Sequence, residues 1–117
     1  MVIAITIYTL SETFINLPNA PMLVKMPIKR IHATVKGKIQ GVSYREFTRR
    51  EAEVLGVTGF VRNLKDGNVE IVAEGDEKKL KDFERKFRKG PLMAFVTDVE
   101  LKEEPATGEF DGFDLRY

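Results

Sequence analysis

Residues 37–45 read GKIQGVSYR and mark the point where a strand-like pattern gives way to a helical one. Gly37 and Gly41 bracket a short loop, and glycine adopts positive φ without steric cost, so successive backbone N–H groups can turn toward one point. The unpaired N–H groups and the dipole of the helix start that follows also attract an anion. These features predict an anion-binding loop, although an ordinary connecting loop explains the same residues equally well when they are taken alone.

Arg45 stands in the first turn of the expected helix. Its guanidinium is charged at any working pH and offers a planar fork that matches two phosphate oxygens. No Gly-Lys-Ser or Gly-Lys-Thr follows the loop, so the spacing argues against a nucleoside-triphosphate site of the Walker type. Arg45 therefore narrows the prediction from an anion to a phosphate group.

The patterns on both sides of this loop predict a single order of elements. Alternating apolar residues indicate strands, and apolar residues at helical spacing indicate helices. The predicted elements are a strand at 28–36, a helix at 44–55, strands at 57–64 and 68–74, a helix at 77–89, a strand at 94–102 and a last strand at 113–117. The order βαββαβ plus one strand predicts an α+β, ferredoxin-like split βαβ sandwich, with both helices on one face of an antiparallel sheet.

Residue-level signals delimit the two helices and the central hairpin. Gly56 is expected to end the first helix, and Asp76 and Gly90 are expected to begin and end the second. The Asp-Gly pair at 66–67 is a strong signal for a tight turn between the two middle strands. Capping and turn residues therefore support the element boundaries that the spacing of apolar residues predicts.

Asn63 becomes a candidate site residue because of this topology. In a split βαβ unit the strands at 28–36 and 57–64 run parallel with one strand between them, so their C-terminal ends open on one edge, about 10 Å apart. Asn63 lies near the end of the second of these strands and hence near the glycine loop. A side-chain amide there can hold a water molecule in line with a bound phosphorus. Alone, Asn63 is an ordinary turn residue; its pairing with Arg45 makes it a candidate.

Three stretches resemble the acylphosphatase family: GKIQGVSYR, GFVRNLKDGNVEIVAEG at residues 59–75, and the terminal FDLRY. The resemblance covers residues 27–117 in the same order and spacing. It implies an enzyme that hydrolyses the carboxyl-phosphate anhydride bond of acyl phosphates without a metal ion or cofactor.

The resemblance also implies roles for individual residues. Arg45 falls on the family's phosphate-binding arginine, and Asn63 falls on its water-positioning asparagine. The family more often has valine at the position of Ile39 and phenylalanine at that of Tyr44, and both changes keep the apolar character. The loop that falls on the family's backbone amide cradle comprises Lys38, Ile39, Gln40, Gly41, Val42, Ser43 and Tyr44.

Residues 1–26 differ in composition from the rest, because Glu12 and Lys25 are their only charged side chains. We therefore expect an N-terminal extension at 1–26 and an acylphosphatase-like domain at 27–117. A basic start is missing and polar residues interrupt the apolar run, so neither a signal peptide nor a membrane-spanning helix fits.

The role of this extension is left open by the sequence. The run MVIAITIYTL suits an additional edge strand, which Pro18, Asn19 and Pro21 would end in a turn or linker. Shielding of a sheet edge and self-association are alternative roles for such a strand. A third alternative is that the segment is not native, since Met22 and Met26 are alternative starts just ahead of the domain.

Charge and residue counts limit the partners. The net charge of +1 gives no global field that would attract nucleic acid or a membrane. The chain has no cysteine and His32 is its only histidine, so a transition-metal site has little support. We expect no cofactor, a small-molecule acyl phosphate as substrate, a cytoplasmic location and a monomer, with the extension as a route to self-association.

Two other functions remain as alternatives. RNA-binding modules share the βαββαβ order, but they need aromatic residues on two central strands, and the segment NVEIVAE at 68–74 has none. A sensing domain would keep the phosphate loop without turnover. The arginines at 49 and 50 and the basic run at 85–89 are expected to be solvated helix residues.

Overall fold

The computed structural model describes residues 5–8, 12–17, 20–25 and 27–117. The first three strands, β1 (Ile5–Tyr8), β2 (Glu12–Leu17) and β3 (Ala20–Lys25), pair with one another as an antiparallel sheet in the order β1-β2-β3. The segment thus holds three strands where the sequence suggested one. Pro21 lies within β3, opposite Asn16, and an edge strand tolerates proline. Pro18 and Asn19 lie outside the described residues, and the division of the chain at residue 26 stays a prediction.

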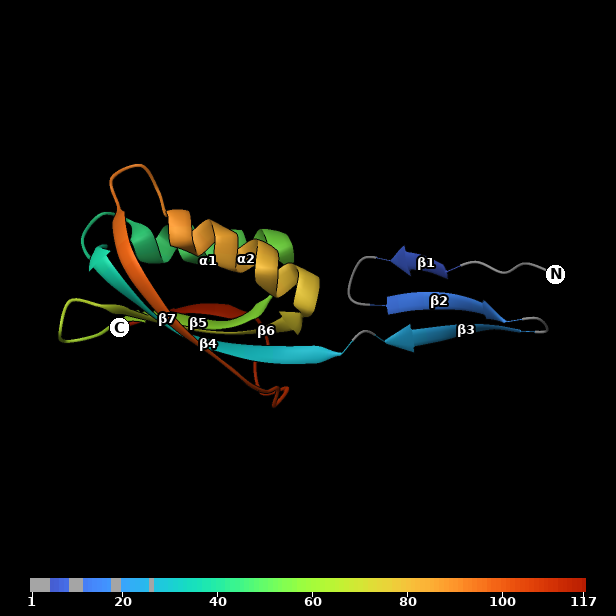
Figure 1. Cartoon of the computed structure of the whole chain (residues 1–117). Coiled ribbons are helices and arrows are strands. Elements are labelled where there is room, and N and C mark those ends of the chain that lie inside the picture. Colours follow the sequence, from blue (N-terminus) through green and yellow to red (C-terminus); the bar gives the residue numbers. More distant parts are fainter. Residues whose placement is uncertain (1–4, 9–11, 18–19, 26) are drawn as a thin grey trace.

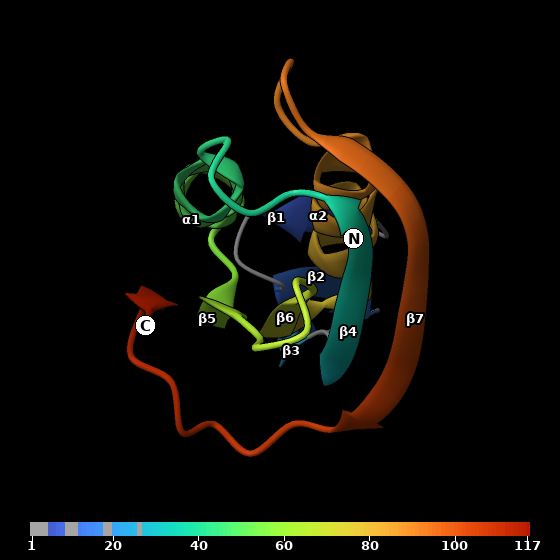
Figure 2. The same cartoon turned by 90° about the vertical axis from the view of Figure 1, so that its left-hand side faces the viewer.

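The remaining elements form a five-stranded sheet and two helices (Figures 1 and 2). They are β4 (Ile28–Lys38), α1 (Tyr44–Leu55), β5 (Thr58–Asn63), β6 (Val69–Asp76), α2 (Glu77–Lys89), β7 (Phe95–Pro105) and β8 (Phe113–Arg116). The strand order is β7-β4-β6-β5-β8, and both helices cover one face of the sheet. The predicted ferredoxin-like α+β fold is confirmed. The last strand pairs parallel with β5, so the sheet is mixed at this edge.

The helix ends follow the predicted caps. Asp76 accepts a hydrogen bond from the backbone N of Lys79 at 2.8 Å, and Gly56 adopts positive φ and donates to carbonyl groups of the last turn of α1. The buried residues of α2 are Leu80, Phe83 and Phe87, whose helical spacing places them on one face. Neither described helix is long and apolar enough to cross a membrane.

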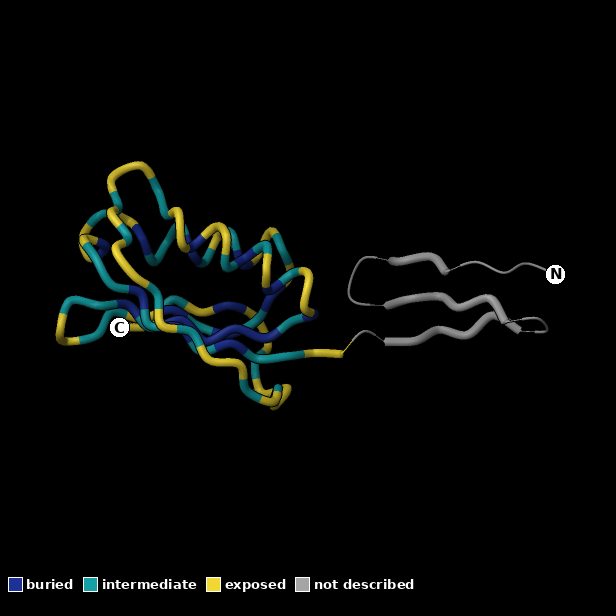
Figure 3. The backbone as a smooth tube through the Cα atoms, in the orientation of Figure 1, coloured by how far each residue is buried: buried dark blue, intermediate teal, exposed yellow. Residues whose placement is uncertain are grey.

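The core lies between the helices and the sheet, where the buried backbone is concentrated (Figure 3). Phe83 links its parts, because its ring centroid lies 5.2 Å from that of Phe87 on the same helix and 5.5 Å from that of Phe113 on β8. Both pairs have an edge-to-face geometry, which suits the quadrupoles of the rings. Phe113 thus anchors the short last strand into the same core as α2.

The central position of β6 sets the relation between β4 and β5. Val69 of β6 lies opposite Asn63 of β5 on one side and opposite Val35 of β4 on the other. Both pairings are antiparallel, so β4 and β5 run parallel to each other. This confirms the predicted topology. It also places the loop after β4 and the C-terminal end of β5 at the same end of the sheet.

We expect Gly37→Ala to destabilise the protein more than Gly67→Ala. Both glycines have positive φ, which costs an alanine roughly 1–3 kcal/mol. A Cβ on Gly37 would also lie 2.0 Å from the carbonyl oxygen of Phe95, whereas a Cβ on Gly67 would meet nothing within 4 Å. Urea unfolding should therefore show an additional loss of about 1–3 kcal/mol for Gly37→Ala. Equal losses in the two variants would contradict this close approach of β4 and β7.

Candidate functional site

A cavity of about 140 Å³ opens at the end of the sheet where β4 and β5 finish. It brings together Arg45 and Asn63, the two side chains to which the sequence analysis assigned chemistry. The other lining residues are Ile39, Gly41, Ser43, Tyr44, Glu46 and Leu115. The cavity therefore joins the glycine loop, the start of α1, the end of β5 and strand β8.

The loop between β4 and α1 owes its shape to two backbone features. A register shift in the β4–β7 pairing occurs between Lys36 and Gly37, just before the loop. Gly41 and Ser43 then both adopt positive φ, at 78° and 63°. Such alternation turns successive N–H groups to the same side of the chain and makes a concave anion site. Ser43 is the one non-glycine residue with positive φ among the described residues, which marks the loop as locally strained.

Two side chains hold the loop in place. Ile39 is buried in the core, with 1% of its surface exposed. Gln40 points to the other side and donates from Nε2 to the carbonyl oxygens of Leu64 and Asn68, both at 2.9 Å. The loop is thereby tied to the β5–β6 hairpin. Of the loop residues named from the sequence, Lys38, Gln40 and Val42 do not line the cavity.

The start of α1 leaves backbone donors available. The bond from Phe47 N to Ser43 O, at 3.0 Å, is the first of the helix. Ser43 makes no side-chain capping bond, so the N–H groups of Tyr44, Arg45 and Glu46 lack a capping partner from it. These groups carry the positive end of the helix dipole, which favours an anion in the cavity.

Arg45 is held from the C-terminal end of the chain. Its Nη1 donates to the carbonyl oxygen of Arg116 at 2.8 Å, and its guanidinium lies 4.7 Å from the ring centroid of Tyr117. A guanidinium has five N–H donors, so most of them remain for a ligand. No role was predicted from the sequence for Arg116, Tyr117, Leu115 or Glu46. The signal that could have found the first three is the pairing of β8 beside β5, which no local pattern specifies.

Asn63 presents an unsatisfied acceptor. Its Oδ1 atom is buried and has no hydrogen-bond partner among the described residues. A buried amide oxygen without a hydrogen bond costs about 1–3 kcal/mol of stability. Because this oxygen lies at a cavity wall, its hydrogen-bond donor can come from a molecule that enters the cavity. A water molecule in the cavity would supply that O–H.

Glu46 contributes a carboxylate to the rim of the cavity. It pairs with Arg49 one turn along the helix, and Arg50 lies 3.9 Å away. The hydrogen bond from Arg49 holds the pKa of Glu46 below its ordinary value. Glu46 is therefore ionised and screened by arginine at neutral pH, which makes it unsuited to act as a general base.

Tyr44 has a structural place beneath the site. Its hydroxyl donates to the carbonyl oxygen of Phe87 at 2.6 Å, and Thr48 Oγ1 donates to the carbonyl oxygen of Tyr44 at 2.9 Å. Burial raises the pKa of the Tyr44 phenol well above its ordinary range. The residue thus joins the start of α1 to the end of α2 and stays protonated.

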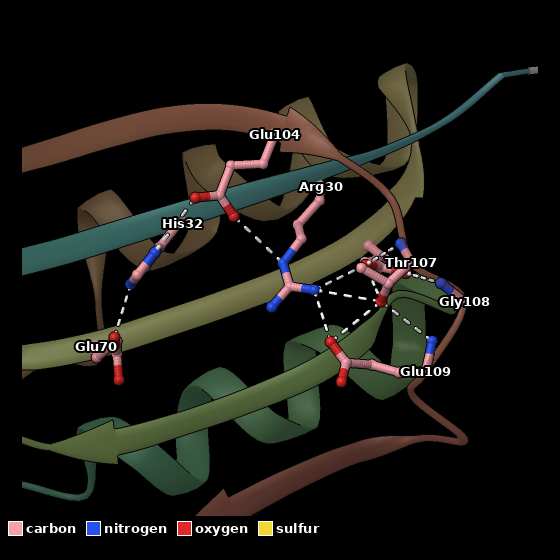
Figure 4. A network of polar contacts seen from close by, with 8 residues as sticks. Arg30, His32, Glu70, Glu104, Thr107, Gly108 and Glu109 are labelled. Carbon is pink, nitrogen blue, oxygen red and sulfur yellow. Dashed lines mark hydrogen bonds and ion pairs between the residues drawn. The ribbon is translucent and has the colours of Figure 1, made fainter.

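His32 does not line the cavity. Its Nε2 lies 2.6 Å from Glu70 Oε2, and its Nδ1 lies 3.7 Å from Glu104 Oε2 (Figure 4). Among the residues that the structure describes, no group of three or more His, Cys, Asp or Glu side chains could hold a metal ion.

Known proteins are similar to this chain in sequence and in fold. The profile of the family described as Acylphosphatase matches residues 31–115. A protein named Acylphosphatase from Marinobacter nauticus is 51% identical over 88 residues, which are 75% of this chain and 96% of the relative. One from Methylococcus capsulatus is 48% identical over 86 residues, or 74% and 94%. The crystal structure of acylphosphatase from Bacillus subtilis matches with a TM-score of 0.74 and 34% identity, covering 76% of this chain and 99% of that one.

We expect Tyr44→Phe to weaken the dependence of stability on alkaline pH. Because the folded protein raises the pKa of Tyr44 above its ordinary value of 10.0, the stability that the neutral phenol contributes is complete below about pH 10 and is lost as the pH rises toward the folded pKa. Urea unfolding at pH 8 and pH 11 should show a smaller loss for Tyr44→Phe than for the parent. Tyr117→Phe, at an exposed tyrosine, is the control and should keep the parental loss.

Proposed function

The chain belongs to the acylphosphatase family and hydrolyses the carboxyl-phosphate anhydride bond of acyl phosphates, and from this premise we propose which residues carry the reaction. Arg45 and the backbone amides of the loop and of the α1 start bind the phosphoryl group. Asn63 holds the attacking water. The observation that carries this proposal is the convergence of a guanidinium and an unpaired amide oxygen on one cavity.

Binding of the phosphoryl group depends on donors alone. Its oxygens are acceptors, and the cavity offers the free N–H groups of Arg45 and unpaired amides at the positive end of a helix. In the transition state negative charge spreads over the equatorial oxygens, and donors already in place stabilise it without reorganisation. The anchor on the Arg116 carbonyl keeps the guanidinium oriented before the substrate arrives.

The attacking water is assigned to Asn63. Oδ1 accepts a hydrogen bond from one O–H of the water. A lone pair of the water oxygen then remains free to approach phosphorus opposite the leaving carboxylate. The bond between phosphorus and the water oxygen forms as the bond to the carboxylate oxygen breaks with its electron pair. The proton of the water goes to a phosphate oxygen, and the products are a carboxylate and inorganic phosphate.

A strong base is not needed in this mechanism. A carboxylate is a good leaving group, so the water need not be deprotonated before attack. The site offers arginine, asparagine and amides, and Glu46 is screened by arginine. This donor set supports a metal-independent reaction.

Further expectations belong to the same proposal. The near-neutral charge supports a protein without a nucleic-acid partner, and the absence of cysteine supports a cytoplasmic location. A monomer is expected, with the N-terminal extension as a route to self-association. The alternative function, phosphate sensing without turnover, would show phosphate binding but no release of carboxylate.

We expect Arg45→Ala and Asn63→Ala to differ in kinetics with benzoyl phosphate. Loss of one well-placed donor typically costs about 2.7–4 kcal/mol, or roughly a hundred- to thousandfold in rate. Arg45→Ala should lose turnover and also raise KM, because it removes contacts made in the ground state. Asn63→Ala should lose mainly kcat.

Arg50→Ala is the matched control, since Arg50 lies on the same helix but is exposed and does not line the cavity. It should keep the parental kcat and KM. If Asn63→Ala hydrolysed benzoyl phosphate at the parental rate, the role assigned to Asn63 would be wrong.

Treatment with a chelator gives an independent test. Phosphate release from benzoyl phosphate should be unchanged after dialysis against EDTA, because Arg45 and amide N–H groups provide the positive charge at the phosphoryl group. Activity that disappeared on chelation and returned with added Mg²⁺ would contradict the metal-independent mechanism.

A further inference from the structure

The loop at residues 106–112 carries the chain from β7 at one edge of the sheet to β8 at the other. Figures 1 and 2 show it on the face of the sheet opposite the helices. It leads into β8, a strand of only four residues. The carbonyl group of Arg116, the last residue of β8, accepts a hydrogen bond from Arg45. Whatever fixes this loop therefore bears on where Arg45 lies.

Glu74 of β6 fixes the loop. Its side chain is 3% exposed, and its two oxygens accept separate bonds: Oε2 from Thr107 N at 2.9 Å and Thr107 Oγ1 at 3.2 Å, and Oε1 from Gly108 N at 3.0 Å. Arg30 Nη1 lies 3.3 Å from Oε2 and supplies the opposing charge. Figure 4 shows Arg30 and the loop residues that converge here. Buried carboxylates are tolerated where several donors and a cation meet them.

An amide could not replace this carboxylate. An ionised carboxylate accepts at both oxygens, whereas a glutamine side chain would turn an NH₂ group toward a backbone N–H of either Thr107 or Gly108. Two donors facing each other repel. The contact is therefore selective for glutamate at position 74.

The loop is connected to the site through β8. Gly59 N donates to the carbonyl oxygen of Gly112 at 2.9 Å, and from there β8 pairs with β5 as far as Arg62 and Arg116. The Arg116 carbonyl then accepts from Arg45. The connection from the Glu74 carboxylate to the guanidinium in the cavity thus runs through the bonds to Thr107 and Gly108, the backbone of the loop as far as Gly112, and the hydrogen bonds of β8 and Arg116.

Stacked side chains follow the same route. The Arg30 guanidinium lies 5.2 Å from the ring centroid of Phe110, and that ring lies 6.0 Å from the ring of Phe60. The Arg116 guanidinium lies 4.0 Å from the centroid of Phe60. Cation–π and edge-to-face contacts of this kind add to the restraint on the loop and on β8.

We propose that Glu74 is a positioning residue for phosphate binding: through the 106–112 loop and β8 it holds the Arg116 carbonyl where it orients Arg45. The inference rests on the proposed role of Arg45. Glu74 does not line the cavity and touches no substrate. Its effect is therefore expected in the affinity for phosphate.

The test compares Glu74→Gln with the parent in benzoyl phosphate hydrolysis and in competitive inhibition by inorganic phosphate. Because misplacement of a binding group by about 1 Å costs up to roughly a hundredfold, we expect KM and the phosphate inhibition constant to rise together by about tenfold in Glu74→Gln. Thr107→Ala, which removes one hydroxyl donor from an exposed loop and leaves the sheet intact, should shift both constants in the same direction by about two- to threefold.

Asp76→Ala is the matched control. Asp76 is a second buried carboxylate of β6 that accepts a backbone N–H, but it caps α2 and does not contact the loop. It should lower the thermal midpoint and leave both constants at parental values below the unfolding range, which separates positioning from loss of stability.

The outcomes separate this inference from the proposed function. If Arg45→Ala raises the phosphate inhibition constant but folded Glu74→Gln and Thr107→Ala keep the parental value, the positioning role of Glu74 is wrong and the role of Arg45 stands. If Arg45→Ala leaves the constant unchanged, the proposed binding role of Arg45 fails first.

Discussion

The pairing of β6 with both β4 and β5 is the constraint on which the site depends. Because both ladders are antiparallel, β4 and β5, which flank β6, run in the same direction and their carboxyl ends lie at the same end of the sheet. Val69 sits between Val35 and Asn63 in this register. A shift by one residue would turn Asn63 to the other face of the sheet, so the hydrophobic register of the core also sets the position of a polar group in the cavity.

One unpaired side-chain acceptor, Asn63 Oδ1, lies at the end of the sheet where β4 and β5 meet the cavity. Asn63 Oδ1 and Arg30 Nε are the buried side-chain atoms without a hydrogen bond in the described part of the chain, and Arg30 Nε still lies 3.4 Å from Glu104 Oε1. Asn63 has no such neighbour. Elsewhere the buried polar groups are satisfied, as Asp76, Glu74 and Tyr44 show. A fold that satisfies its other buried groups and leaves donors and an acceptor open at one cavity is suited to bind a small anion and a water molecule.

The elements themselves were largely predictable from the sequence. Residues such as Asp76, Gly56 and Gly90 act through local hydrogen bonds and backbone dihedral angles, so their effect can be inferred from their neighbours in the chain. The N-terminal residues were less predictable, because apolar β-branched runs suit many strand pairings. Pro21 lies in a strand there, since proline excludes central strands and still permits edges.

The candidate site shows the same division. Sequence alone determined the glycine loop, the arginine at the helix start and the asparagine at the strand end, because each follows from a local pattern or from the order of the elements. Only the tertiary structure decided that β8 lies parallel to β5, that Arg116 and Tyr117 hold Arg45, and that Glu74 secures the loop leading to them. These contacts join residues far apart in the chain, 71 positions in the case of Arg45 and Arg116, and no periodicity within a segment can specify them.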